Sequence, residues 1–320
     1  MLANPIPVAA FDMFTDGTSQ KAEDTQPNPA KGATFRWLHF DLNTPDLEDW
    51  CHENIPSMAF RTLLATRTRP RVDVHEDGIL LTLRGINLNE GQEVEDMVSL
   101  RLWATQTLVI TVRKQRIFAL DEIKSQIMTG DAPDTPARLI ARMTEKLVDR
   151  IETVSLDLED RTEDLETLVY DKESPPPPDL APLRRSVITL RRHIGPLSEA
   201  IVDLAKVDSN LISKDFRSRL RHTANRAKRS VDEVHEVGDR LTALADHVEL
   251  QQDTRLARNS YVLSIIAAIF LPLGFLTGLF GVNVAGMPGT AHPDAFVILC
   301  IAMVALGVFL YLVLRWIKWF

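Results

Sequence analysis

The fold is decided by two uncharged stretches near the C-terminus, YVLSIIAAIFLPLGFLTGLF at residues 261–280 and AFVILCIAMVALGVFLYLVL at residues 295–314. As α-helices with a rise of ~1.5 Å per residue, each would be about 30 Å long, which matches the hydrocarbon core of a bilayer. The alternative is a pair of buried core helices, but two adjacent uncharged segments of this length make that a poor explanation. The sequence predicts two transmembrane helices, with Pro272 kinking or loosening the first.

The connection between the two stretches, GVNVAGMPGTAHPD at residues 281–294, is short and rich in Gly and Pro, which predicts a turn and an antiparallel hairpin. The loop contains no Lys or Arg. Arg255 and Arg258 precede the first stretch, and Arg315 and Lys318 follow the second. By the positive-inside rule, both ends of the chain are cytosolic and the loop lies outside an inner membrane.

Charge is distributed unevenly along the chain. It has 36 Lys and Arg against 44 Asp and Glu, a net charge of −8, which argues against a nucleic-acid partner. Residues 259–320 contain only Asp294, Arg315 and Lys318 as charged groups. A charged N-terminal part is therefore joined to an apolar tail, and this distribution argues against a purely soluble protein. The first Lys is Lys21, and no apolar run follows a basic N-terminus, so no secretory signal peptide is expected.

The chemistry expected of an enzyme is missing from the sequence. The cysteines Cys51 and Cys300 cannot build a disulfide framework or a thiolate zinc site, so both are expected to be unpaired and reduced. No Gly-rich phosphate loop, dinucleotide fingerprint, HExxH helix or GxSxG elbow occurs, and the eight histidines are scattered. We therefore predict no enzyme and no resident cofactor.

The polar part of the chain divides into three regions. Residues 1–33 lack periodicity and are predicted to be disordered. Residues 34–130 mix strand and helix patterns and predict a small α/β domain. Its expected strands are 35–41, 79–88, 97–103 and 107–112, and its expected helices are 47–66 and 118–128. Residues 131–213 predict a helical hairpin, with helices at 137–173 and 183–206 separated by the prolines at 175–178.

A third helix is expected to begin near Lys214 and to form a stalk over residues 214–260 that runs into the first span at residues 261–280. Its apolar and small residues repeat with alternating spacings of four and three, which is a heptad pattern. The pattern consists of Leu220, Ala224, Ala227, Val231, Val234, Gly238, Leu241, Ala245 and Val248. We interpret this seam as packing against copies of itself, as in a coiled coil; the alternative is burial against the chain's own helices.

The end of the first span reads Phe280-Gly281-Val282-Asn283. A Gly-x-Asn triplet after the first of two C-terminal spans resembles the CorA superfamily of metal-ion transporters, although Val replaces the usual Met and Phe the usual Tyr. The extension GVNVAGMPG is similar to the ZntB-type zinc transporter branch. So are RPRVDVHEDGILLTLRGINLN (69–89) and EDMVSLRLW (95–103), and the resemblance covers about residues 34–320.

The resemblance implies a CorA-like funnel: a homopentamer in which the first span lines a central pore, the second lies outside it, and residues 315–320 form a cytosolic tail. It also implies transport of Zn²⁺, with Mg²⁺, Co²⁺, Ni²⁺ and Cd²⁺ as the other divalent candidates, and import coupled to protons. The oligomer would satisfy a physical need, because a single hairpin cannot enclose a pore and a bare ion is costly to move through hydrocarbon.

The expected pore-facing stripe of the first span carries no carboxylate, so an ion should pass largely hydrated. It consists of Ser260, Leu263, Ala267, Leu271, Gly274 and Gly278. The selectivity filter is expected at Gly281, Val282 and Asn283, where the Asn283 amide oxygen accepts hydrogen bonds from the ion's bound waters. His292 and Asp294 in the outer loop are further candidates for collecting Zn²⁺.

Two other functions remain open at this stage. The first is a Mg²⁺ or Co²⁺ channel of the same superfamily. The second belongs to another class, a membrane-anchored coiled-coil scaffold or sensor without a pore.

Overall fold

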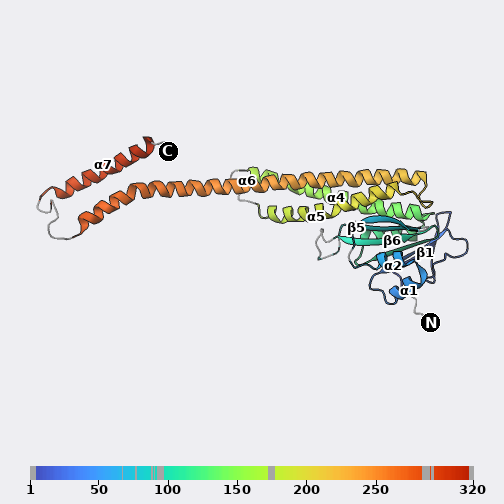
Figure 1. The fold of residues 1–320 in the computed structure, drawn as a ribbon. Helices are drawn as coiled ribbons and strands as arrows, with labels where there is room; N and C mark the ends of the chain where they lie inside the picture. Colours follow the sequence, from blue (N-terminus) through green and yellow to red (C-terminus); the bar gives the residue numbers. More distant parts are fainter. Residues whose placement is uncertain are drawn as a thin grey trace. The chain divides into compact units, whose positions relative to one another are not determined.

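The computed structural model describes residues 5–66, 68–75, 78–87, 89, 91, 97–171, 177–282, 289 and 292–316. The chain forms two compact units, Met1–Ala245 and Asp246–Phe320. Figure 1 shows the ribbon of each.

The first unit is built on a seven-stranded sheet with the order β2-β1-β3-β7-β6-β5-β4. Its strands are β1 (Ala9–Met13), β2 (Ser19–Lys21), β3 (Phe35–Asp41), β4 (Arg71–His75), β5 (Gly78–Gly85), β6 (Val98–Ala104) and β7 (Leu108–Arg113). Only β3 and β7 pair in parallel, in a register that aligns Trp37 with Val109; the other neighbours are antiparallel. The mixed sheet confirms the predicted α/β domain.

Helices cover both faces of this sheet (Figure 1). The short helices α1 (Leu47–Asn54) and α2 (Ser57–Leu63) pack on one face, where Trp50 and Leu63 join Phe40, Leu80 and Trp103 in a single core. Successive side chains of a strand point to opposite faces, and Gly85 of β5 faces the other side. A Cβ there would lie 2.7 Å from Leu147 Cδ2, so a long helix approaches this second face closely.

The helices following the sheet are α3 (Phe118–Met128), α4 (Pro136–Tyr170), α5 (Leu180–Lys206) and α6 (Lys214–Gly281). Thr135 caps α4 by accepting a hydrogen bond from the Arg138 amide, and Pro136 occupies the first turn, where no amide hydrogen is required. The helix predicted at 118–128 and the start of the stalk helix at Lys214 are both confirmed.

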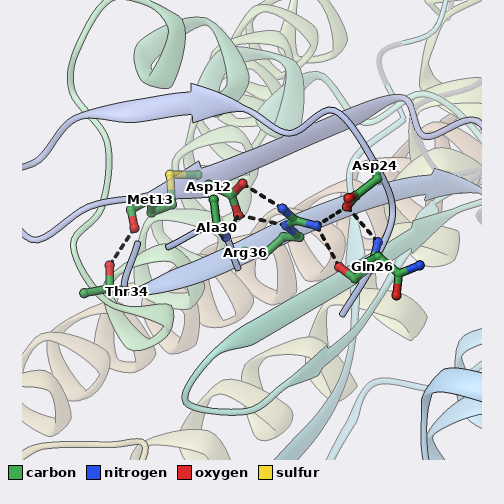
Figure 2. Close-up of polar contacts among 7 residues, drawn as sticks. All are labelled: Asp12, Met13, Asp24, Gln26, Ala30, Thr34 and Arg36. Carbon is green, nitrogen blue, oxygen red and sulfur yellow. Dashed lines mark hydrogen bonds and ion pairs between the residues drawn. The ribbon is translucent and has the colours of Figure 1, made fainter. Parts of the chain in front are cut away.

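The predicted disorder of residues 1–33 is wrong for residues 5–33. Strand β1 is buried and completes the sheet beside β3, and β2 pairs with β1. Figure 2 shows what holds the segment: Arg36 of β3 donates from Nε and Nη2 to the two carboxylate oxygens of Asp12, each at 2.8 Å. Its Nη1 donates to the Gln26 carbonyl at 2.9 Å and pairs with Asp24. These contacts join residues that are far apart in the sequence, so the local pattern of polar residues does not predict them.

The expectation that the heptad seam packs against other copies is wrong for residues 220–241. Leu220, Ala224, Ala227, Val234, Gly238 and Leu241 are buried within this chain. A Cβ on Gly238 would lie 3.2 Å from Val187 Cγ1 and 2.6 Å from Arg191 Nη1, both of α5, so the small residue permits close approach of that helix. The spacing of a seam specifies which face is buried and not which partner buries it.

Ion pairs join α6 to α4 along the same stretch. Arg226 binds Asp149 and Glu152, and Arg240 donates from Nε and Nη2 to the carboxylate of Glu166 at 2.8 and 2.7 Å. The hydrogen bonds from Arg240 hold the pKa of Glu166 below its usual value. Both cysteines are free, as predicted, and burial raises the pKa of the Cys51 thiol to about 12.

The single helix expected at 47–66 is two helices. Ile55 between α1 and α2 is extended, with φ −137° and ψ 157°. It precedes Pro56, and the proline ring disfavours the helical conformation of the residue before it. Strand β4 was not among the strands expected from the sequence pattern, although RVDVH alternates polar and β-branched residues, and only the resemblance of residues 69–89 to the ZntB-type branch covered it. It lies at an edge of the sheet.

Burial of His39 on β3 makes acid destabilise the first unit. Burial, and secondarily the charge of Arg113, lowers the pKa of His39 to about 3, whereas an unfolded chain titrates near 6.5. The stabilisation is therefore present above pH ~6.5 and is lost as the pH falls toward 3. Between pH 7 and pH 5 we expect a loss of about 2 kcal/mol in the free energy of unfolding.

Unfolding of the full-length protein, followed by tryptophan fluorescence at the two pH values, measures this loss. His39→Gln retains a polar side chain beside Thr111 but cannot gain a proton, so its stability should change less between pH 7 and pH 5. Equal losses in the two proteins would show that another group carries the dependence.

Candidate ion pathway

The second unit contains the C-terminal part of α6 and the helix α7 (Ala295–Trp316). Each helix contains a long apolar stretch of which no residue is buried within the chain. Both helices are long and apolar enough to cross a membrane. Helix α6 continues through Pro272 to Gly281, so the first predicted span is the end of the stalk helix.

Within this unit, α7 covers one face of α6. From Tyr261 onward, the half-buried residues of α6 are Ile265, Ala268, Ile269, Pro272, Leu273 and Leu276. Those of α7 include Leu299, Met303, Leu306, Gly307 and Leu310. A Cβ on Gly307 would lie 3.9 Å from Leu273 Cδ1, which is ordinary contact and shows that the two helices meet at these faces. The hairpin is thus held by apolar packing.

The predicted pore-facing stripe lies on the other side of α6. All six of its residues are exposed, and at about 100° per residue its centre is roughly 160° around the helix from the centre of the covered face. No heavy atom of the described residues lies within 4 Å of a Cβ placed on Gly274, Gly278 or Gly281. The structure therefore brings the stripe together on a face that α7 leaves open.

The predicted filter lies at the end of α6. Gly281 is the last residue of the helix and Val282 follows it, both exposed, whereas Asn283 lies outside the described residues. Its role stays a prediction. Because Gly281 has no side chain, its backbone can approach a ligand or a neighbouring chain closely.

His292 and Asp294 lie at the start of α7. The Asp294 amide donates to His292 Nδ1 at 3.2 Å, and the Ile298 amide donates to the Asp294 carbonyl at 3.0 Å. Binding of a metal at Nδ1 would have to displace this hydrogen bond, and the roles of His292 and Asp294 in collecting Zn²⁺ stay a prediction. Within the described ranges, no group of three His, Cys, Asp or Glu side chains could hold a metal ion.

An apolar cavity of about 590 Å³ adjoins this turn, between the ends of α6 and α7. Leu276 and Phe280 line it from α6, and Phe296 and Leu299 from α7, with His292 at the turn. Apart from His292 and Gly289, the lining is hydrophobic and offers no ligand to a hydrated cation, so we do not assign the cavity to the ion pathway.

Two helices long and apolar enough to cross a membrane, preceded by a sheet domain covered by helices, are the pattern of a membrane protein with a large N-terminal domain. A family model described as "CorA-like Mg2+ transporter protein" matches residues 32–316. The chain belongs to this CorA-like family, as the Gly-x-Asn motif and the topology had predicted.

Individual relatives cover most of the chain. It is 32% identical over 288 residues to the divalent cation transporter CmaX of Pseudomonas aeruginosa, spanning 88% of this chain and 87% of the relative. It is also 32% identical over 272 residues to the zinc transport protein ZntB of Pectobacterium carotovorum, spanning 84% and 83%.

Solved structures share the fold. A structure of full-length CmaX superposes with a TM-score of 0.84 at 28% identity and covers 99% of both chains. The CorA magnesium transporter of Methanocaldococcus jannaschii superposes with a TM-score of 0.79 over 97% of this chain and 98% of its own, and its 17% identity supports the fold alone.

Proposed function

We propose that this chain is a membrane transporter of divalent metal cations and that its principal ion is Zn²⁺. The relatives named as zinc and divalent cation transporters support the class of ion. The observation that carries the proposal is the uncharged stripe of α6 from Ser260 to Gly278, which is exposed opposite α7 and is followed in the sequence by the predicted filter at Gly281, Val282 and Asn283.

The mechanism follows from what the stripe lacks. It has no carboxylate, imidazole or thiol, so it cannot replace the water shell of a divalent cation. A conduit must therefore be wide enough for a hydrated ion, and several copies of the stripe must surround it. We propose a homopentamer with a ring of Asn283 amides at the outer mouth, where weak contact through bound water lets the ion leave again.

The orientation we propose is that of the positive-inside rule, with both ends in the cytosol and the loop at 281–294 outside an inner membrane. Proton coupling of import is proposed from the resemblance to the ZntB-type branch. Uptake of ⁶⁵Zn²⁺ into proteoliposomes with and without an imposed pH gradient tests it: an acid exterior should accelerate uptake by a coupled importer and leave an uncoupled pore unchanged.

The alternative to a zinc transporter is a Mg²⁺ or Co²⁺ channel, which the description of the matching family favours. Competition of unlabelled metal ions with ⁶⁵Zn²⁺ for uptake distinguishes the two functions. A zinc transporter should lose ⁶⁵Zn²⁺ uptake with micromolar unlabelled Zn²⁺ and keep most of it in millimolar Mg²⁺. If millimolar Mg²⁺ abolished ⁶⁵Zn²⁺ uptake and micromolar unlabelled Zn²⁺ did not, the protein would be a magnesium channel.

A scaffold or sensor without a pore predicts no flux of any ion. The mass of the detergent-solubilised protein is a first test, because a central pore requires more than one or two chains of 36.0 kDa. We expect a pentamer, and a monomer or dimer would exclude the proposed conduit.

Gly274→Asp tests whether the stripe faces the ion. In a narrow shared conduit, the new carboxylates would form a ring that binds Zn²⁺ directly and slows its exit. We expect Zn²⁺ uptake to fall by roughly tenfold, the effect of about 1.4 kcal/mol. Gly274→Ala is the matched control, since a methyl group meets no described atom within 4 Å and adds no charge. Equal uptake by the Asp and Ala variants, at equal oligomer content, would place this face away from the ion.

A further inference from the structure

A second cavity, of about 560 Å³, lies in the N-terminal unit and has a lining unlike that of the ion pathway. It is bordered by the end of α2, the segment that follows α2, and strands β4, β5 and β6. Its lining consists of Arg69, Arg71 and Arg84, five threonine and serine residues, and Ala65. No Asp or Glu is among the described residues that line it, although the whole chain has a net charge of −8.

The strand register explains why these side chains meet. Thr82 of β5 is opposite Arg71 of β4 on one side and Arg101 of β6 on the other, and Arg84 of β5 is opposite Ser99 of β6. Residues two apart on a strand point to the same face, so these five side chains share one face of the sheet. Three of the five are arginines.

Arg101 is the most unusual member of this group. It is 1% exposed, and Nη2 donates to the Ala65 carbonyl at 2.8 Å. Its Nε and Nη1 atoms are buried without a hydrogen-bond partner, and no carboxylate in the described part of the chain forms an ion pair with it. Burial alone lowers its pKa. A guanidinium stays charged in proteins, so the fold retains a buried positive charge without a described carboxylate partner, next to Ala65 and Thr82, which line the cavity.

Two of the three arginines that line the cavity, Arg84 and Arg71, form hydrogen bonds within the chain. Arg84 donates from Nη2 to the Thr68 carbonyl at 2.7 Å, and its Nη1 lies 2.7 Å from His193 Nδ1. Arg71 donates to the Thr62 hydroxyl at 3.1 Å, and its one acidic partner, Asp73, forms an exposed pair with it. Arg84 and Arg71 are therefore held by contacts within the chain before any ligand arrives, and of these two only Arg71 pairs with a carboxylate among the described residues.

We propose that this cavity binds a small molecule bearing a phosphate group. Guanidinium groups match phosphate oxygens with paired donors, and the surrounding hydroxyls supply further donors to a tetrahedral anion. A volume of about 560 Å³ lies within the range of small-molecule sites and exceeds what a single inorganic anion needs. Arg101 does not line the cavity itself, but a dianion bound beside Ala65 and Thr82 would lie near its buried charge and offset it, which a neutral ligand could not do. The site is separate from the proposed ion conduit and does not depend on it.

Calorimetric titration of the full-length protein in detergent, with ATP, AMP or inorganic phosphate at constant ionic strength, tests the proposal. We expect binding by at least one of these probes and a raised unfolding temperature in its presence. Preference for a nucleotide identifies the phosphate as part of a larger molecule, whereas equal affinity for inorganic phosphate identifies free phosphate. Absence of binding by all three at millimolar concentration, or the same effect from chloride, would overturn the proposal.

Substitution of the arginines that line the cavity tests whether the phosphate compound binds there. Arg69→Gln and Arg71→Gln should each weaken binding of the effective probe by about tenfold, the effect of one lost charged hydrogen bond. Arg61→Gln is the matched control, because Arg61 is exposed on α2 and does not line the cavity. If both variants bound the probe with the affinity of the original protein, the probe would not bind in this cavity.

Arg101→Met separates a binding role from a structural one. Methionine fills a similar volume without a buried charge, so the variant should unfold at the same or a higher temperature in probe-free buffer. The stabilisation that the probe gives to the original protein should be lost. An unfolding temperature well below that of the original protein without probe would show that Arg101 supports the fold, contrary to the proposal.

Discussion

Zn²⁺ uptake by the Asn283→Ala variant is expected to fall by roughly tenfold or more in proteoliposomes. In the proposed pore, each copy contributes one amide oxygen that accepts a hydrogen bond from the water shell of the passing ion. Alanine removes this acceptor from every copy at once, so the hydrated ion loses its ordered contact at the outer mouth. The initial rate of ⁶⁵Zn²⁺ entry, normalised to the amount of reconstituted oligomer, measures the effect.

The control for this prediction is Asn43→Ala, the same substitution at an exposed position of the N-terminal unit. It should leave uptake unchanged. Asn283→Gln retains the amide and should keep more uptake than Asn283→Ala. If Asn283→Ala transports zinc as fast as the original protein, the proposed amide filter does not exist.

Arg36→Met is expected to destabilise the N-terminal unit by about 3–5 kcal/mol. The side chains of Arg36 and Asp12 are only 5% and 3% exposed, and the two groups share paired hydrogen bonds (Figure 2). Methionine removes the cation and leaves the Asp12 carboxylate buried without its partner. Denaturant unfolding of the full-length protein, followed by the fluorescence of tryptophans such as Trp37 in the adjacent core, measures the loss.

Two variants test this explanation. Arg161→Met removes an exposed ion pair with Asp157, in which both side chains are more than half exposed, and should cost at most about 1 kcal/mol. Combining Arg36→Met with Asp12→Leu removes both charges and should recover part of the lost stability. If the double variant is as unstable as the sum of its single changes, the buried unpaired charge is not the cause.

Elements with strong local patterns could be predicted from the sequence. The uncharged stretches indicated both membrane helices, and the apolar spacing at 118–128 and the start at Lys214 match α3 and α6. Strand β1 could not be predicted, because its sequence AAFDM is short and its partner β3 lies about twenty residues further along the chain. The seam of α6 was located correctly but assigned to the wrong partner, since spacing carries no information on which chain buries it.

The candidate ion site was predictable to a similar extent. Helical periodicity placed the stripe from Ser260 to Gly278 on one face, and the structure leaves that face uncovered. The roles of His292 and Asp294 depended on residue type alone and stay a prediction, and the hydrogen bond from the Asp294 amide to His292 Nδ1 shows that the two residues share one turn. The phosphate cavity had no local signal, because its arginines and threonines come from several segments that only strand pairing brings together.

The position of β1 also determines how the protein can be shortened. The family match begins at residue 32, which suggests a natural place to start a trimmed gene, yet the sheet begins at Ala9. Starting there would leave β3, with Phe35 and Trp37, as a bare sheet edge, and would remove Asp12 from Arg36. Such an edge pairs readily with other molecules, so the trimmed protein should aggregate during expression.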